Sequence, residues 1–189
     1  MKILVINGSP RRNGNTSQLM DLILDSTKKA NRDFEILRYD LNDLAFKGCQ
    51  GCMGCKQETS KGCVQADDLT PVLQAMQDSD AWVIGTPIYM GNMSGQLKLC
   101  VDRIYGFMGP NRTNRIPPGK KAVIAVTQGM QDVNQYKATT DMLLYMLGRR
   151  GLQVEALIAG GGSSSGMSGF GQETKDRAAS LGEWLVATR

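Results

Sequence analysis

The sequence alternates between short apolar runs and amphipathic segments, and this alternation constrains the fold more than any other feature. The apolar runs have the length and composition of strands buried on both faces, and the segments between them have helical spacing. We predict strands at residues 2–8, 34–40, 81–87, 121–128 and 154–160, and helices at 16–29, 67–79, 94–105, 134–150 and 173–187. Strands that alternate with helices form a parallel sheet with helices on both faces. We therefore predict one α/β domain over residues 1–189, a three-layer sandwich around a five-stranded parallel sheet.

The order of these elements also indicates where a ligand would bind. In parallel sheets of this kind, ligands lie outside the carboxyl ends of the strands, near the point where the strand order reverses. The loops after the first, third and fourth strands are therefore candidate binding elements. A cysteine-rich loop at 47–63 follows the second strand, so we expect it at the same edge.

The composition excludes several classes of function. The chain has 22 Lys and Arg against 18 Asp and Glu, a formal charge of +4, and the basic residues are scattered, so we predict no nucleic-acid binding. It contains no histidine, which excludes Ser-His-Asp and Cys-His catalysis. No run approaches the roughly 18 apolar residues of a membrane span, and the apolar run before Asn7 is too short for a signal-peptide core. We predict a cytoplasmic protein that does not contact a membrane.

The loop "NGSPRRNGNTS" (7–17) joins the first strand to the first helix and is rich in hydrogen-bond donors. Amide groups and a positive dipole end at the start of a helix attract a phosphate, and the side chains of Ser9, Asn15, Thr16 and Ser17 add further donors. The sequence does not match G-x-x-x-x-G-K-[ST] or G-x-G-x-x-G, although Asp40 ends the second strand where a ribose-binding acid would stand. We therefore reject a nicotinamide nucleotide as the resident ligand.

The stretch "GTPIYMGNMSGQLKLCVDR" (85–103) narrows the class of protein. Together with "NGSPRRNGNT", it closely resembles the NADPH-dependent FMN reductase and iron-sulfur flavoprotein families, which have the flavodoxin-like fold. The resemblance implies that FMN binds. It places the phosphate and the isoalloxazine ring on three loops: Ser9, Arg11, Asn15, Thr16 and Ser17; Thr86, Pro87, Ile88, Tyr89, Gly91 and Asn92; and, within the "TQG" of 127–129, Gln128 and Gly129. Hydride transfer to a flavin needs no acid-base side chain, so we name no catalytic residue.

The cysteine-rich loop "KGCQGCMGCKQETSKGC" has the pattern C-x2-C-x2-C-x7-C, formed by Cys49, Cys52, Cys55 and Cys63. The first three cysteines repeat the ferredoxin-like spacing for a [4Fe–4S] cluster, and iron-sulfur flavoproteins carry a compact motif of this kind. A zinc site is less favoured because zinc ribbons separate two C-x2-C knuckles by about 15–20 residues. A redox pair is a further alternative. Cys100 lies on an apolar helix face, and we expect it to be a buried small hydrophobe.

Two functions remain open at this point. One is an electron-transfer flavoprotein that takes electrons from a ferredoxin through its cluster to FMN. The other is an NAD(P)H-dependent reductase of FMN or a quinone without a cluster. For either, the resemblance implies a homodimer or homotetramer with the flavin near the interface. The basic segment 111–121 could contact NADPH or an acidic ferredoxin or be a solvated loop, and the Gly/Ser-rich segment 159–171 is expected to be a subunit contact or a lid.

Overall fold

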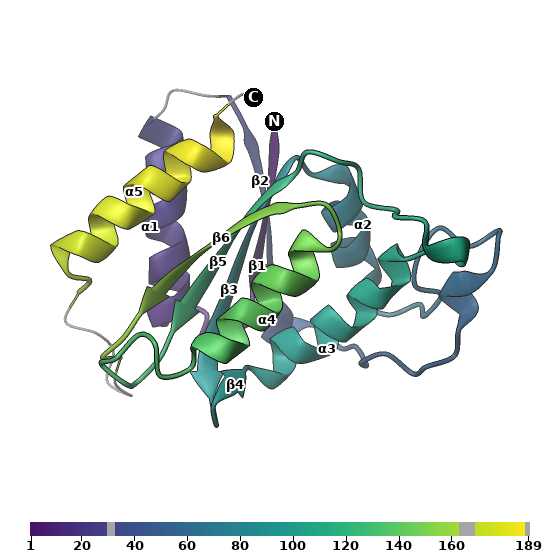
Figure 1. The fold of residues 1–189 in the computed structure, drawn as a ribbon, viewed down its shortest axis with the longest axis horizontal. Coiled ribbons are helices and arrows are strands. Elements are labelled where there is room, and N and C mark those ends of the chain that lie inside the picture. The colour runs from purple at the N-terminus through teal and green to yellow at the C-terminus, as the bar shows by residue number, and fades with distance from the viewer. Residues whose placement is uncertain (30–32, 163–168, 188–189) are drawn as a thin grey trace.

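A computed structural model describes residues 1–29, 33–162 and 169–187, which form an α/β fold with the sheet at its centre (Figure 1). Five parallel strands follow the order β2-β1-β3-β5-β6. They are β1 (Lys2–Asn7), β2 (Glu35–Asp40), β3 (Ala81–Tyr89), β5 (Lys121–Thr127) and β6 (Gln153–Ala159). The chain moves from β1 to one side and then returns to place β3 on the other, so the order reverses between β1 and β3. This is the flavodoxin-like order, and the predicted fold class is confirmed.

Helices cover both faces of the sheet, which gives the three predicted layers (Figure 1). One face carries α1 (Asn15–Lys29) and α5 (Gln172–Val186). The other carries α2 (Thr70–Asp78), α3 (Gly95–Arg103) and α4 (Lys137–Gly148). Each helix begins and ends within a few residues of its predicted bounds.

The apolar run of β1 explains why the sheet is central. Side chains of a strand alternate between its two faces, and Ile3 and Val5 pack under α1 and α5 while Leu4 and Ile6 pack under the opposite helices. All four are fully buried. A strand that is buried on both faces can be apolar throughout, which explains the continuous apolar run of β1 in the sequence.

The largest local difference from the prediction lies at the end of β3. The strand continues to Tyr89 and turns back through Met90 and Gly91 into a short antiparallel strand, β4 (Asn92–Met93). Met90 and Gly91 have positive φ angles of 49° and 78°. Two such residues in succession form the two-residue turn that best matches the twist of a hairpin. The sequence "IYMGNM" carries the glycine but not the usual Asn-Gly pair, so the hairpin was not predicted.

Two further predictions concern the Gly/Ser-rich segment 159–171 and contact with a membrane. Residues 163–168 of the Gly/Ser-rich segment lie outside the described residues, so its expected role as a subunit contact or lid stays a prediction. Within the described ranges, none of the helices combines the length and the apolar character that are needed to cross a membrane.

Candidate functional site

A cavity of about 300 Å³ opens at the carboxyl edge of the sheet, between the loop after β1, the end of β3 and the loop after β5. Ligands of such sheets bind at this edge, where the strand order reverses. Nine of the residues predicted to bind the cofactor line the cavity: Ser9, Arg11, Asn15, Thr16, Pro87, Ile88, Tyr89, Gln128 and Gly129. Three loops that are far apart in the sequence thus meet at one site.

The loop between β1 and α1 is held in shape by its own hydrogen bonds. The Ser9 amide donates to Oδ1 of Asn7 (3.0 Å), and the Arg11 amide donates to Oγ of Ser9 (3.1 Å). The Gly14 amide then donates to the Arg11 carbonyl (3.1 Å), just before α1 begins. Amides in the first turn of a helix have no acceptor within the helix, and the positive end of the helix dipole lies there. The loop is therefore suited to bind a phosphate.

The floor of the cavity is formed where α1 meets the sheet. The hydroxyls of Thr16, in the first turn of α1, and Thr127, at the end of β5, share a buried hydrogen bond of 2.7 Å. The helix lies this close because Gly85 of β3 has no side chain. A Cβ at Gly85 would lie 2.4 Å from Sδ of Met20 and 2.8 Å from Cγ2 of Thr16.

Two further predicted residues lie beneath or beside the cavity and have partners of their own. Thr86 is fully buried, and its Oγ1 accepts a hydrogen bond from the Ser94 amide (3.1 Å), just before α3 begins. The hydroxyl of Ser17 accepts a hydrogen bond from the guanidinium of Arg38 on β2. Both side chains therefore act in the structure as supports for the loops that line the cavity.

The last two predicted residues, Gly91 and Asn92, belong to the β3–β4 hairpin rather than to the cavity wall. The Gly91 carbonyl accepts a hydrogen bond from Oγ1 of Thr139 on α4 (3.0 Å). A Cβ at Gly91 would lie 3.6 Å from the Tyr136 ring, so the hairpin lies against the start of α4. This contact holds the hairpin in which Tyr89, a lining residue of the cavity, ends β3.

Gly14 and Gly162 line the cavity but were not predicted, and Thr127 was named only as part of its motif. Gly14 lies within the quoted phosphate loop, where its spacing from α1 could have identified it. Gly162 had no local signal, because its position depends on the pairing of β6 with β5. Its amide donates to the Gln128 carbonyl (3.0 Å), and the Gln128 amide donates to the Ala159 carbonyl (3.0 Å).

The two arginines of the first loop have different roles. Arg11 lines the cavity, whereas Arg12 pairs with Asp43 and lies 4.0 Å from Asp40. The hydrogen bond and the charge of Asp43 raise the pKa of Arg12. Asp40 also accepts a hydrogen bond from Nδ2 of Asn7 (2.7 Å). Asp40, the acid at the end of β2, therefore holds the loop between β1 and α1 in place.

All four predicted cysteine ligands line a second, much smaller cavity of about 20 Å³, together with Arg103. Cys55 is buried, Cys63 is half-buried, and Cys49 and Cys52 are exposed. The donor set is therefore four thiols around one enclosed space. As the side chains stand, no three of the described Cys, Asp and Glu residues are gathered into a group that could hold a metal ion.

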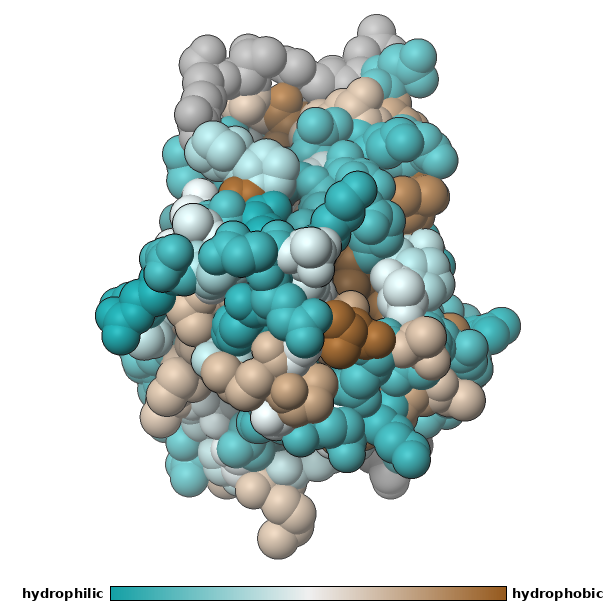
Figure 2. All heavy atoms as spheres, turned by 90° about the vertical axis from the view of Figure 1, so that its right-hand side faces the viewer, coloured by the Kyte–Doolittle hydropathy of each residue, from teal (hydrophilic) through white to brown (hydrophobic). Residues whose placement is uncertain are grey.

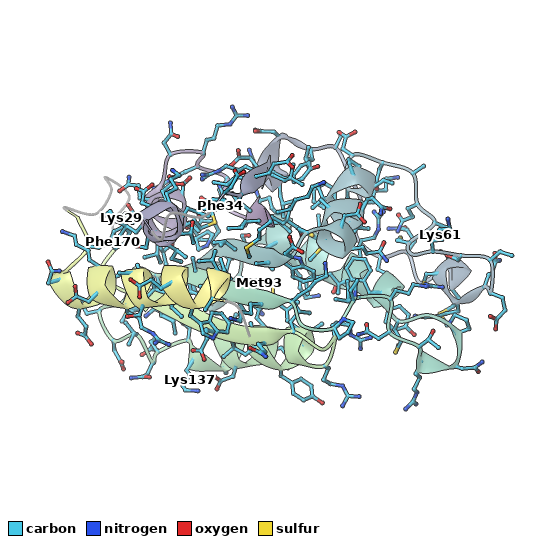
Figure 3. All side chains as sticks on the ribbon, turned by 90° about the horizontal axis from the view of Figure 1, so that it is seen from above. Lys29, Phe34, Lys61, Met93, Lys137 and Phe170 are labelled. Carbon is cyan, nitrogen blue, oxygen red and sulfur yellow. The ribbon has the colours of Figure 1, made fainter. Side chains whose placement is uncertain are left out.

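The position of the cysteine loop corrects the expectation that it shares the flavin's edge of the sheet. Ser94 caps α3 at the carboxyl edge, and Cys63 contacts Arg103 at the other end of that helix. A helix of nine residues is about 13 Å long at 1.5 Å per residue. In Figure 1 the loop extends beyond the end of α3, away from the β3–β4 hairpin. Lys61 of the loop accordingly lies at one end of the molecule and Phe170 at the other (Figure 3).

The loop runs away from the sheet edge because a second arginine holds its middle portion. Arg115 donates to the carbonyls of Cys55 (2.8 Å), Gly106 (2.8 Å) and Ser60 (2.5 Å). This residue belongs to the basic segment 111–121, for which the sequence predicts either a contact with NADPH or ferredoxin or a solvated loop. Its guanidinium instead points into the protein.

Cys100 lies on α3 and is fully buried, as the apolar helix face predicted. Burial raises the pKa of its thiol to about 12, against a smaller opposing effect of the Arg103 charge. The thiol therefore stays protonated at neutral pH and belongs to the core.

Comparison with known proteins agrees with this site. Residues 1–167 match the family described as NADPH-dependent FMN reductase. An iron-sulfur flavoprotein of Archaeoglobus fulgidus is 38% identical over 156 residues, which cover 82% of this chain and 72% of that protein. One from Methanocaldococcus jannaschii is 36% identical over 103 residues, which cover 54% of this chain and 51% of that protein, so the chain spans about half the length of this second relative.

Among solved structures, an NAD(P)H:quinone oxidoreductase from Methanothermobacter marburgensis has a TM-score of 0.73, with 20% sequence identity. The superposition covers 100% of this chain and 98% of that one, and at this identity it shows a common fold. The family match covers most of the sequence and includes all three loops of the cavity. The chain therefore belongs to the NADPH-dependent FMN reductase family of FMN-dependent oxidoreductases.

Proposed function

We propose that the protein is an iron-sulfur flavoprotein, which takes electrons from a ferredoxin-type donor through a [4Fe–4S] cluster and passes them by way of FMN to an acceptor. The observation that carries this proposal is the set of four thiols around one small cavity. The relatives named iron-sulfur flavoproteins support it. A reducing cytoplasm, the compartment that we propose, would keep the thiols free to bind iron.

We assign the larger cavity to FMN. Its phosphate would be held by Ser9, Arg11, Asn15 and Thr16 at the start of α1, and its ring would lie along Pro87 to Tyr89 with Gln128 and Gly129 on the other side. FMN supplies the redox chemistry, and the protein supplies position and electrostatics. The hydroxyls of Thr16 and Thr127 share one hydrogen bond at the edge of this cavity, so one hydroxyl proton of the pair would remain for the phosphate. Ser17, Thr86, Gly91 and Asn92 would act through the loops they support.

The cysteine loop fits a cluster by its donors and by its enclosure. Four sulfur ligands are the usual set for a [4Fe–4S] cluster, and all four of these line one cavity. Cluster binding would draw together thiols that are not yet gathered. Cys49 and Cys52 are exposed, so a donor protein could approach them from the end of the molecule shown in Figure 2, where hydrophilic side chains predominate.

A second candidate function is an NAD(P)H-dependent reductase of FMN or a quinone without a cluster. The observation that favours it is that the thiols, among the described residues, are not gathered around a metal position. In that case NAD(P)H would bind transiently over the flavin, and the cysteines would be a redox pair or have no metal role.

We also propose that the protein forms a homodimer or homotetramer with the flavin near the interface. Met90, at the tip of the β3–β4 hairpin, is completely exposed, and Tyr89 beside it is 45% exposed. Two adjacent large side chains that are exposed, one of them a lining residue of the cavity, suit a subunit contact.

The decisive experiment is to purify the protein without oxygen and to measure FMN, iron and acid-labile sulfide per chain. We expect one FMN and four irons in the wild type. Cys52→Ala should lose the iron and keep FMN, because the phosphate loop is a separate element. Cys100→Ala is the matched control and should keep both. Wild-type protein with FMN but no iron, reduced rapidly by NADPH alone, would establish the clusterless reductase instead.

A further inference from the structure

The guanidinium of Arg103 is completely enclosed at the end of α3, and every one of its donors is directed at the cysteine loop or at the residues just after it. Nε donates to Sγ of Cys63 (2.9 Å). One terminal nitrogen donates to the Lys47 carbonyl (2.9 Å) and to Asp67 (2.8 Å), and the other donates to the Gln65 carbonyl (3.2 Å) and to Asp67 (3.2 Å). An arginine side chain has five N–H groups, so all of them are used here.

These contacts connect the two ends of the loop. Lys47 precedes the first cysteine of the motif, and Gln65 and Asp67 follow the last one. A buried guanidinium requires a charged partner, and Asp67 supplies it in the two-pronged geometry that arginine favours. Burial alone would raise the pKa of Asp67, but the hydrogen bonds from Arg103 and from the Lys47 and Leu69 amides outweigh this effect and lower it. The loop is thus closed around an ion pair.

Four of the five N–H groups donate to backbone carbonyls or to Asp67. The fifth, on Nε, points at the sulfur of Cys63. An N–H group that donates to a ligand sulfur withdraws electron density from it. Uptake of one electron makes an iron-sulfur site more negative by one unit without making or breaking a bond. A cationic donor on a ligand sulfur stabilises that more negative state, so it shifts the reduction potential upwards.

We propose that Arg103 is the positioning residue of the metal site. It holds Cys63 as the fourth ligand, and its Nε–H group raises the reduction potential of the cluster. This inference rests on the proposed function, because it requires that the four thiols bind a cluster. It assigns a role to a residue that lies 40 positions from Cys63 in the sequence.

Arg115 provides a matched control within the same loop. It also anchors the loop through carbonyl groups, those of Cys55 and Ser60, and it also lies at the end of α3 through Gly106. None of its recorded hydrogen bonds is to a sulfur. A substitution at Arg115 therefore tests the loss of an anchor, and a substitution at Arg103 tests the loss of an anchor together with the sulfur contact.

The experiment compares Arg103→Lys, Arg103→Gln and Arg115→Gln with the wild type, all purified without oxygen. Iron and sulfide per chain are measured first, and the midpoint potential of the cluster is then measured by a redox titration followed by electron paramagnetic resonance. We expect both Arg103 variants to have a more negative midpoint potential than the wild type, and Arg115→Gln to keep the wild-type potential. FMN content and circular dichroism identify any variant that does not fold.

Arg103→Lys keeps the positive charge but cannot reproduce the planar fork, so it remains informative if Arg103→Gln does not fold. Loss of iron from both Arg103 variants, with retention in Arg115→Gln, supports the holding role. A full cluster with an unchanged potential in the Arg103 variants overturns the inference. Equal loss of iron from Arg115→Gln also overturns it, because any anchor of the loop would then have the same effect.

The outcomes separate this inference from the proposed function. If the wild type contains no iron after anaerobic purification and reconstitution, the proposed function fails before any variant is compared. If the wild type contains a cluster and the Arg103 variants do not differ from it, only the role of Arg103 fails.

Discussion

The hydroxyl groups of Thr16 and Thr127 lie 2.7 Å apart at the floor of the larger cavity, and they join the first turn of α1 to the end of β5. Residues separated by 111 positions are thereby fixed beside each other. The pair is buried, so its hydroxyls are oriented before any ligand arrives. Their shared hydrogen bond uses one of the two hydroxyl protons and leaves the other for a phosphate that binds at the start of α1.

We predict that Thr16→Val weakens FMN binding by about 10- to 150-fold, because a hydrogen bond to a charged group contributes about 1.5–3 kcal/mol. Valine keeps the shape of threonine but lacks the hydroxyl. Fluorescence titration of apoprotein with FMN measures the effect. Thr27→Val is the matched control: Thr27 lies on the same helix and donates to the Leu24 carbonyl (2.6 Å), away from the cavity. An unchanged affinity in Thr16→Val would remove Thr16 from the phosphate site.

The cysteines should differ sharply in their reaction with iodoacetamide. In iron-free protein at pH 8, Cys49 and Cys52 are exposed and should be alkylated first. Cys100 has a pKa of about 12 because it is buried, so only about one molecule in ten thousand carries its thiolate at that pH. We expect Cys100 to be labelled only after unfolding, as measured by peptide mass spectrometry. Labelling of Cys100 at the rate of Cys49 would show that α3 opens in the native protein.

The Asp67–Arg103 pair should make stability depend on pH at the acidic end. The folded-state pKa of Asp67 is lowered from its ordinary 3.8, so the native state binds the proton less tightly than the unfolded chain does. The stabilisation is therefore complete at a pH above the pKa that Asp67 has in the unfolded chain. It is lost as the pH falls through the lower pKa that Asp67 has in the folded protein. Asp67→Asn should lower the free energy of unfolding by about 1–3 kcal/mol at pH 7. Its deficit should shrink below pH 4 in urea titrations of the iron-free protein, and a constant deficit would contradict the assignment.

Replacement of Met90 tests the proposed subunit contact. Met90 has φ of 49°, a conformation that asparagine tolerates well, and Asn-Gly is the preferred pair for this hairpin turn. Met90→Asn should therefore preserve the hairpin while it removes the apolar side chain. We expect weaker self-association by sedimentation velocity, with an unchanged circular dichroism spectrum. Met53→Asn is the control, because Met53 is also exposed with a positive φ but lies in the cysteine loop. Equal association of Met90→Asn and wild type would place the interface elsewhere.

The sequence by itself determined the layers of the fold and the three loops of the cavity. Strand and helix periodicities are local properties, and the carboxyl edge of a parallel sheet is a property of topology alone. Topology places these loops at one edge, and the resemblance to the FMN reductase family is what assigned Tyr89 and Gln128 to the same site as Ser9 and Thr16. The burial of Cys100 was likewise evident from the apolar face of its helix.

The tertiary structure alone decided where the cysteine loop lies and what shapes it. A segment without periodic structure has no pattern that gives its path, and its start after the second strand led to the expectation that it lies at the carboxyl edge of the sheet. The path is fixed by the buried Arg103 and the half-buried Arg115, whose guanidinium groups donate to loop carbonyls and, from Arg103, to the carboxylate of Asp67. In the sequence these residues are ordinary charged positions. They shape the cysteine loop only in the folded protein, because a guanidinium that is removed from water must take its hydrogen bonds from the surrounding chain.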